Sequence, residues 1–275
     1  MHGSTKLVRL GVVKFLNSKP LIEGLEGRPD VELHFAVPSA LAGMLKAGQV
    51  DAALVPVIDW ARAGGAWERV SDAGIASDGQ TLTVRIYSRV PPESMTVLHV
   101  DGDSHTSVRL ARLIWEHVYH RRLRQIPLSS ASSIRDCESV LLIGDKVVTT
   151  AMVDFEYNID LGEAWKRWTG LPFVFAVWVA PAGLAMNQEL GTMLNEARDR
   201  GVAKAGELAA RHAPDCGWPV DLAVRYLTHY LTYRITPAAR QGIERFVTLA
   251  MIEEEVAACS TPSALAAGKA SPHAH

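Results

Sequence analysis

Small polar residues stand at several places where a predicted strand ends or a predicted helix begins. The free N–H groups and the dipole at a helix start favour a carboxylate. Open α/β sheets bind their ligands at the carboxyl ends of the strands. These positions therefore predict a site for a small anionic organic molecule, bound mainly by hydroxyl, amide and backbone groups. The residues are Asn17 after the first strand, Ser39, Thr106 and Ser107 at helix starts, and Gly144 and Asp145 at the end of a later strand.

Most of these residues also have an ordinary structural role open to them. Ser39 and Thr106 are of the residue types that cap helix N-termini, and most helices need such a cap. Asn17 can form a turn before Pro20. Asp145 can cap the helix that follows it. Taken singly, none of them identifies a site.

The sequence lacks the short motifs of several common catalytic classes. It contains no Gly-x-Ser-x-Gly, no phosphate-binding loop, no Gly-x-Gly-x-x-Gly, no His-Glu-x-x-His and no Cys-x-x-Cys. Cys137, Cys216 and Cys259 are widely separated, which favours reduced thiols over a metal site. We therefore expect no metal, no organic cofactor and no covalent nucleophile.

Composition and charge are typical of a globular protein. The chain has 275 residues, of which 48% are hydrophobic and 21% charged, and its formal net charge is −2. This length suffices for two lobes, and the lack of a basic surplus argues against a nucleic-acid partner. No apolar stretch reaches the roughly 18 residues of a membrane helix, and no secretory signal is visible. We expect a cytoplasmic protein that binds neither nucleic acid nor membrane, and the oligomeric state is left open.

Predicted strands and helices alternate along most of the chain. Apolar runs at 7–13, 51–55 and 173–179 predict buried strands. Helical spacing of apolar residues, as in 161–168, predicts helices between them. Such alternation implies an α/β fold with a largely parallel sheet. After the last strand only helices are expected, including one with an apolar face over 222–231.

Two features indicate that the chain passes twice between two lobes. The segment 89–92, which contains two prolines, interrupts the pattern and precedes a second series of strands and helices. The apolar run at 173–179 then leads into the closing helices. The ligand is expected in the cleft between the lobes, although a single doubly wound domain would give a similar pattern. The expected units are lobe one, 1–89 plus 178–259; lobe two, 90–177; and a disordered tail, 260–275.

Six sequence blocks stand in a particular order along the chain. They are LNSKPL at 16–21, the block 38–51, SDG at 77–79, TSV at 106–108, LIGD at 142–145, and DLGEAWKRWTGLPFVFAVW at 160–178. In type and order they resemble the MqnA-type chorismate dehydratases, which act in the futalosine route of menaquinone biosynthesis. The similarity covers roughly residues 7 to 255. One short block is weak evidence, whereas six in order, with the last one long, are specific.

The resemblance implies a type-2 periplasmic-binding-protein-like fold with chorismate, a small dianionic substrate, in the interlobe cleft. It implies a cofactor-independent hydro-lyase that makes 3-[(1-carboxyvinyl)oxy]benzoate and water. Asn17 matches the family's cleft asparagine near the reacting part of the substrate. Thr83 stands where the family usually carries a serine, so the hydroxyl is kept and an added methyl group changes the packing. The expected site is Asn17 and Thr83 as catalytic residues, Ser39, Thr106, Ser107, Gly144 and Asp145 as substrate-binding residues, and no metal ligand.

The residue types suit this chemistry. Loss of the ring hydroxyl and of a neighbouring ring proton makes the ring of chorismate aromatic, so the driving force lies in the substrate. The protein has to orient the leaving hydroxyl, stabilise developing charge and exclude water. We hypothesise that one of chorismate's own carboxylates assists removal of the proton.

Three other functions fit parts of the sequence. A solute-binding protein for a small carboxylate would bind its ligand unchanged, but it would need export. A sister enzyme of the same pathway uses the same fold to release dihydroxynaphthoate from a cyclic precursor. The Leu-Asn start at 16–17 and the segment 168–172 favour the dehydratase over that enzyme. A ligand-sensing regulatory domain would need a DNA-binding segment, and no helix-turn-helix is visible.

Overall fold

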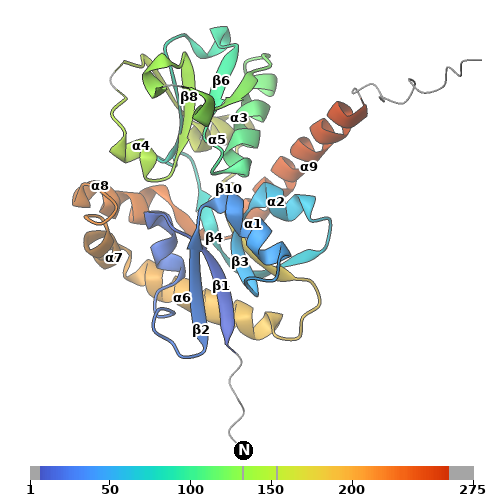
Figure 1. Ribbon diagram of the computed structural model, residues 1–275, viewed down its shortest axis with the longest axis vertical. Coiled ribbons are helices and arrows are strands. Elements are labelled where there is room, and N and C mark those ends of the chain that lie inside the picture. Colours follow the sequence, from blue (N-terminus) through green and yellow to red (C-terminus); the bar gives the residue numbers. More distant parts are fainter. Residues whose placement is uncertain (1–6, 132, 153, 260–275) are drawn as a thin grey trace, which may run out of the picture.

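The protein consists of two lobes, each built on its own β-sheet (Figure 1). The computed structural model describes residues 7–131, 133–152 and 154–259, with side chains in the last helix described to residue 252. The predicted tail, 260–275, lies outside the described residues. No helix within the described part of the chain is both long enough and apolar enough to span a membrane.

The first lobe contains a six-stranded sheet with the order β11-β4-β10-β3-β1-β2. Strand β1 is parallel to β2 and β3, whereas β10 is antiparallel to β3 and β4, and β11 is antiparallel to β4. Strands β3 and β10 are buried over almost their whole length, as expected for strands covered on both faces. The strands are β1 (Val8–Val13), β2 (Val31–Ala36), β3 (Ala52–Pro56), β4 (Trp67–Ser77), β10 (Phe173–Pro181) and β11 (Thr232–Arg234).

Helices of the first lobe come from both ends of the chain. The long helix α9 runs outward from the body of the molecule, past α2 (Figure 1). The helices are η1 (Leu16–Leu21), α1 (Pro38–Lys46), α2 (Val57–Arg62), α6 (Asn187–Ala203), α7 (Ala205–His212), α8 (Val220–Arg225), the π-helical turn η5 (Tyr226–Tyr230) and α9 (Pro237–Cys259).

The second lobe contains a five-stranded sheet with the order β7-β6-β8-β5-β9. Strand β6 is parallel to β7 and β8, and β5 is antiparallel to β8 and β9. The strands are β5 (Val84–Ser88), β6 (Val97–Val100), β7 (Arg124–Pro127), β8 (Ser139–Ile143) and β9 (Tyr157–Asp160). The helices are η2 (Pro92–Ser94), α3 (His105–His117), η3 (Leu128–Ser130), η4 (Ile134–Asp136), α4 (Lys146–Thr149) and α5 (Leu161–Thr169).

Both sheets are mixed, so the prediction of a largely parallel sheet is wrong. The reason lies in the two crossings between the sheets, from β4 to β5 and from β9 to β10. The strand that follows each crossing runs antiparallel to its neighbours in the sheet that it joins. Strand β5 pairs antiparallel with β8, and β10 pairs antiparallel with β3.

The membership of the sheets differs from the predicted lobe boundaries. Residues 84–88 were expected in lobe one but form β5 of the second sheet, and residues 173–177 were expected in lobe two but belong to β10 of the first. The prolines at 91 and 92 lie in the turn between β5 and β6 of one sheet. On this evidence we propose boundaries between the lobes near residues 82 and 172.

The start of α1, near the lobe junction, is capped differently from the prediction. Helix α1 begins at Pro38 after Val37, and no side chain caps it, so the predicted cap at Ser39 is wrong. Proline is favoured at the first helical position because its missing N–H is not needed there. At the other end of α1, Gly48 has a left-handed backbone (φ +66°) just after the helix, which is a common way for a helix to end.

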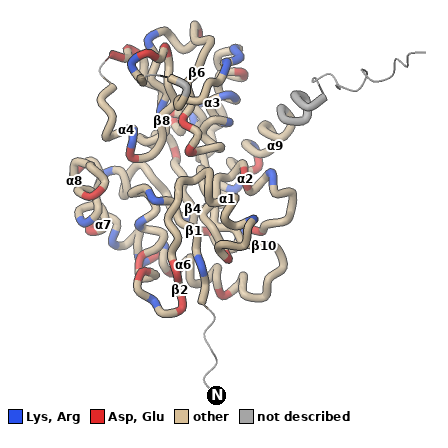
Figure 2. The backbone as a smooth tube through the Cα atoms, viewed as in Figure 1, with Lys and Arg blue, Asp and Glu red and all other residues tan. Residues whose placement is uncertain are grey.

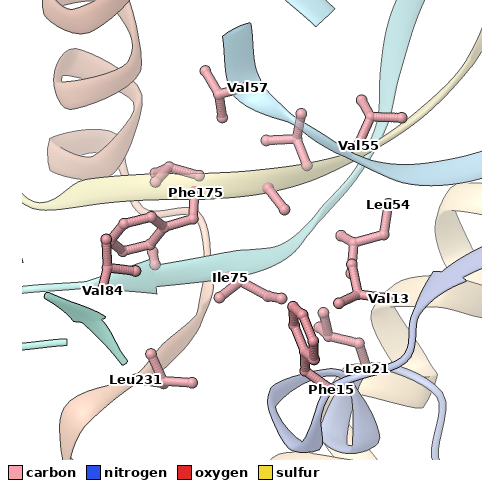
Figure 3. Close-up of a cluster of buried hydrophobic side chains, with 14 of the residues drawn as sticks. Val13, Phe15, Leu21, Leu54, Val55, Val57, Ile75, Val84, Phe175 and Leu231 are labelled. Carbon is pink, nitrogen blue, oxygen red and sulfur yellow. The ribbon is translucent and has the colours of Figure 1, made fainter. Parts of the chain in front are cut away.

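Apolar side chains from both lobes meet at the junction. Val84 at the start of β5 lies beside Phe175 of the first lobe, and Phe15, Ile75 and Leu231 of that lobe belong to the same cluster (Figure 3). All five are nearly inaccessible to solvent. Burying one such side chain contributes about 1.5–3 kcal/mol, so this cluster helps to fix the two lobes beside each other.

Candidate functional site

A pocket lies between the two lobes, where strands of both sheets end or begin. Its wall includes Val13 at the end of β1 and Pro56 at the end of β3, and Ile143 at the end of β8. The space between protein atoms there is about 490 Å³, a volume that includes open solvent at the mouth. This is the kind of position at which open α/β sheets bind ligands. The other lining residues are Phe15, Asn17, Pro38, Ile75, Thr81, Thr83, Val84, Ser104, Ser107, Gly144, Phe175, Ala176, Tyr226 and Leu231.

The residues that line this pocket are uncharged. Lysine and arginine lie elsewhere, intermixed with aspartate and glutamate over both lobes (Figure 2). An anionic ligand in the pocket would therefore be held by hydrogen bonds and a helix N-terminus rather than by ion pairs. The polar side chains available for this are Asn17, Thr81, Thr83, Ser104, Ser107 and Tyr226.

Tyr226 joins the two residues that were predicted to be catalytic. Nδ2 of Asn17 donates a hydrogen bond to the Tyr226 hydroxyl at 3.3 Å. Oγ1 of Thr83 lies 2.7 Å from the same hydroxyl. Oδ1 of Asn17 is buried and has no hydrogen-bond partner among the described residues. Because such an unpaired acceptor costs about 1–3 kcal/mol, we expect a bound ligand or water to satisfy it.

The position of the Tyr226 hydroxyl is tightly fixed. Its ring stacks on that of Trp218, with ring centres 4.8 Å apart and planes inclined by 20°. The residue lies in the π-helical turn η5, and such turns are frequent at functional sites. Burial raises the pKa of Tyr226 well above its ordinary value, so the hydroxyl keeps its proton. The sequence placed Tyr226 only on the apolar face of a helix, and nothing in its pattern distinguished it from core residues.

Gly144 allows the two lobes to approach closely. Its backbone has a left-handed φ of +62°, which favours glycine. A Cβ atom at this position would lie 2.8 Å from a carbon of the Phe15 ring. Gly144 follows β8 and lines the pocket, at the strand end that the sequence predicted.

Asp145 reaches across the junction instead of lining the pocket. Its Oδ1 accepts a hydrogen bond from Nε1 of Trp218 at 3.0 Å, and its Oδ2 accepts one from the backbone N–H of Leu16 at 3.4 Å. It occupies the cap position of α4 but makes no capping bond with its side chain. Burial raises the pKa of this carboxyl group. Asp145 thus connects the second lobe to Leu16, next to Asn17, and to the ring that supports Tyr226.

The start of α3 contributes two serines to the pocket. Oγ of Ser104 accepts a hydrogen bond from the backbone N–H of Ser107 at 3.3 Å. The same atom lies 3.0 Å from Oγ of Ser107. Ser104 is thus the helix cap, and sequence analysis missed it because it stands two residues before the expected start. Thr106 is fully buried outside the pocket, where its Oγ1 accepts a bond from the N–H of Ile58 at 3.3 Å.

The predicted site residues therefore fall into two groups. Asn17, Thr83, Ser107 and Gly144 line one pocket. Ser39, Thr106 and Asp145 do not line it, and each makes a contact between the lobes. The N–H of Ser39, for example, donates to the carbonyl of Asp103 at 3.0 Å. Ligand-binding roles for these three stay predictions, to which the geometry lends no support.

In the described part of the chain, no cluster of three or more His, Cys, Asp or Glu side chains is arranged to hold a metal ion. The expectation of a cofactor-independent protein remains a prediction.

Several known proteins are similar to this chain. A chorismate dehydratase of Thermus thermophilus is 27% identical over 259 residues, which cover 86% of this chain and 93% of that protein. A solved structure from Archaeoglobus fulgidus has a TM-score of 0.71 at 15% identity, covering 92% of this chain and 100% of that one. The periplasmic aliphatic sulphonate binding protein SsuA of Escherichia coli has a TM-score of 0.60 at 14% identity, covering 91% and 94%. The fold is therefore periplasmic-binding-protein-like, as the sequence resemblance implied.

The chain also matches the model of a protein family. The model described as menaquinone biosynthesis matches residues 8–251. This range includes both sheets and every residue that lines the interlobe pocket. The chain therefore belongs to the menaquinone biosynthesis family.

Proposed function

We propose that this protein is a chorismate dehydratase, which converts chorismate to 3-[(1-carboxyvinyl)oxy]benzoate and water without a metal or an organic cofactor. The observation that carries the proposal is the family match over residues 8–251, which spans an interlobe pocket lined by amide and hydroxyl groups. Similarity to the chorismate dehydratase of Thermus thermophilus supports the choice of reaction. We further propose that the enzyme acts in the cytoplasm on this small dianionic substrate.

The pocket offers complementary surfaces for the parts of chorismate. Phe15, Ile75 and Phe175 provide apolar walls for the ring. Ser104 and Ser107 provide hydroxyls at the start of α3, where the helix N-terminus favours a carboxylate. Asn17 and Thr83 are then available for the ring hydroxyl that leaves.

The reaction needs little more than orientation and charge stabilisation. The C–O bond of the ring hydroxyl breaks, and the neighbouring ring carbon loses its proton. The electron pair of that C–H bond completes the aromatic ring, and the hydroxide takes up the proton to give water. Asn17 and Thr83 stabilise the departing oxygen through hydrogen bonds, and a carboxylate of the substrate receives the ring proton first and then passes it to the hydroxide. The apolar walls exclude water, which strengthens these interactions.

The direct test is to incubate the purified protein with chorismate, without added cofactor, and to follow the product by mass spectrometry. Chorismate also decomposes slowly in solution, so a sample without protein and a sample with the Asn17→Ala variant serve as controls. We expect the enolpyruvyl benzoate, which is lighter than chorismate by one water, to form rapidly with the wild-type protein, at least about 100-fold more slowly with Asn17→Ala, and not at all without protein. Folded wild-type protein that yields no such product would contradict the proposal.

The same experiment separates the alternatives. A solute-binding protein would bind chorismate or another small carboxylate and return it unchanged. The sister enzyme that releases dihydroxynaphthoate would leave chorismate intact and convert its own cyclic precursor. No observation on the pocket favours either of these over dehydration.

A further inference from the structure

We infer that Tyr226 is a positioning residue of this site, whose hydroxyl makes the pocket-facing groups of Asn17 and Thr83 complementary to a hydroxyl group of the ligand. The inference rests on the proposed function for the identity of that ligand. It rests on the structure for the hydrogen-bond chain from Asn17 through Tyr226 to Thr83.

The number of protons on the three side chains decides which end of this hydrogen-bond chain donates and which end accepts. Nδ2 of Asn17 donates to the Tyr226 oxygen, so the single proton of Tyr226 is free to donate to Oγ1 of Thr83. The proton of Thr83 is then left for the pocket. At the other end, Oδ1 of Asn17 is the buried acceptor without a partner in the described part of the chain. The chain of hydrogen bonds thus presents one acceptor, Oδ1 of Asn17, and one donor, the hydroxyl of Thr83.

The complementary polarity survives if the Asn17 amide is turned over. Oδ1 would then accept the Tyr226 proton, Tyr226 would accept the proton of Thr83, and Nδ2 would become the pocket-facing donor. One end is still a donor and the other an acceptor, because Tyr226 has only one proton to give. The raised pKa of Tyr226 means that this proton stays in place at neutral pH.

A ligand hydroxyl fits such a pair of ends, since it donates one hydrogen bond and accepts others. In chorismate the ring hydroxyl is the leaving group. Its oxygen gains negative charge as the C–O bond breaks, so the donor end of the chain binds it more strongly in the transition state than in the ground state. Tyr226 therefore acts on the reaction through Asn17 and Thr83.

The surroundings of Tyr226 allow a clean substitution. Tyr226→Phe removes the hydroxyl and keeps the ring that stacks on Trp218. A matched control lies nearby in β11, where the Tyr233 hydroxyl is buried and has no hydrogen-bond partner among the described residues. Tyr233 does not line the pocket. Tyr233→Phe thus removes the same atom from a similar environment and leaves the hydrogen bonds among Asn17, Tyr226 and Thr83 in place.

The test compares steady-state kinetics of the two variants with chorismate. For Tyr226→Phe we expect kcat to fall by about 10- to 100-fold with KM changed by less than about threefold, since the lost interaction is strongest in the transition state. For Tyr233→Phe we expect both constants within about twofold of wild type. Turnover by Tyr226→Phe at the wild-type rate would overturn the inference.

A double substitution distinguishes positioning from a general effect on folding. If Tyr226 acts through its hydrogen-bonded partners, Tyr226→Phe should lower the residual activity of the Asn17→Ala protein by less than about threefold. The reason is that the effects of substitutions at residues that act together are not additive. An equal fold-loss in both backgrounds would contradict the positioning role. Thermal unfolding by circular dichroism checks that each variant is folded.

Failure of the proposed function would be seen separately, in the wild-type protein itself. If folded wild type binds chorismate without converting it, calorimetry with chorismate tests the inference alone. Tyr226→Phe should then weaken binding by about 3- to 10-fold, as expected for one lost hydrogen-bonding group, and Tyr233→Phe should not. Equal affinities of wild type and Tyr226→Phe would overturn it.

Discussion

Two of the regions in which the lobes touch are an inner region at the pocket and an outer region between α2 and α3, and these two differ in how completely their polar groups are paired. The inner region comprises Asn17, Thr83, Tyr226, Gly144 and Asp145, and it contains the unpaired acceptor of Asn17. The outer region comprises Ile58, Asp59, His105 and Thr106, together with the bond from Ser39 to Asp103.

In the outer region each of these groups has its partner. Asp59 accepts from Nδ1 of His105 at 2.9 Å and pairs with Arg62 at 3.5 Å. The hydroxyl of Thr106 accepts from the N–H of Ile58. A contact completed by the protein itself leaves nothing for a ligand, whereas the inner region leaves one acceptor unmet. Incomplete pairing of a buried polar atom, rather than residue type, distinguishes the site from the interlobe contact.

The largest effect is expected at the unpaired acceptor of the inner region. Asn17→Ala should lower kcat by about 100- to 1,000-fold, the usual loss for one preorganised hydrogen-bonding group that acts on developing charge. Its fold should persist, because the amide makes only one hydrogen bond within the part of the chain that the structure describes. Steady-state kinetics with chorismate, together with a thermal melt, check both parts. Normal turnover by a folded variant would remove Asn17 from the mechanism.

The sequence could supply Asn17 because the block LNSKPL links it to a known family, and family blocks also include Gly144 and Ser107. It could not separate Thr106 from Ser107. Consecutive residues of a helix point about 100° apart, so only one of the pair faces the pocket, and the choice depends on how α3 sits against α2. The contribution of Tyr226 was not predictable from a pattern, since it arises from stacking on Trp218 and a π-helical turn.

The fold was predictable to a similar degree. Buried strands such as β3 and β10 are continuous apolar runs and were expected close to their observed bounds. Strand β4 was missed because its sequence, WERVSDAGIAS, mixes charged and small residues without a clear period. It is held in place by its neighbours β10 and β11, with irregular register to both. Its pairing is a property of the tertiary fold rather than of the segment.

The next largest effect is expected at Asp145, which fixes the inner region from the second lobe. Asp145→Ala leaves the N–H groups of Trp218 and Leu16 without their acceptor. The free energy of unfolding should fall by about 1–3 kcal/mol, the usual result of leaving buried donors unpaired. Turnover should fall by about 10-fold because Asn17 and Tyr226 lose support. Urea denaturation and kinetics test this against Asp221→Ala, at an exposed position in α8; equal stability of the two variants would contradict it.

A pH effect is expected in the outer region, at His105. The hydrogen bond to Asp59 is the main cause that raises the pKa of His105 above its ordinary value of 6.5, while burial and Arg62 oppose it. The folded protein therefore favours the charged imidazole. Its contribution to stability is fully present below pH 6.5 and is lost as the pH rises through the raised pKa of the folded state.

Comparison with His105→Gln isolates this contribution. The wild-type protein should exceed the variant in free energy of unfolding at pH values below 6.5, and the difference should shrink as the pH rises above that value. Denaturant titrations across this range measure it. A difference that stays constant with pH would show that the ion pair between His105 and Asp59 does not respond as its geometry implies.

The smallest effects on turnover are expected where the outer region holds residues that the sequence placed at the site. Ser39→Ala removes a hydroxyl that does not line the pocket and keeps the backbone bond to Asp103. Thr106→Val removes the acceptor of the buried Ile58 N–H, so it should cost about 1–3 kcal/mol of stability. Both variants should keep kcat/KM within about twofold of wild type. A loss beyond about 10-fold in either one, with normal folding, would place that residue in contact with substrate and move the boundary between the two regions outward.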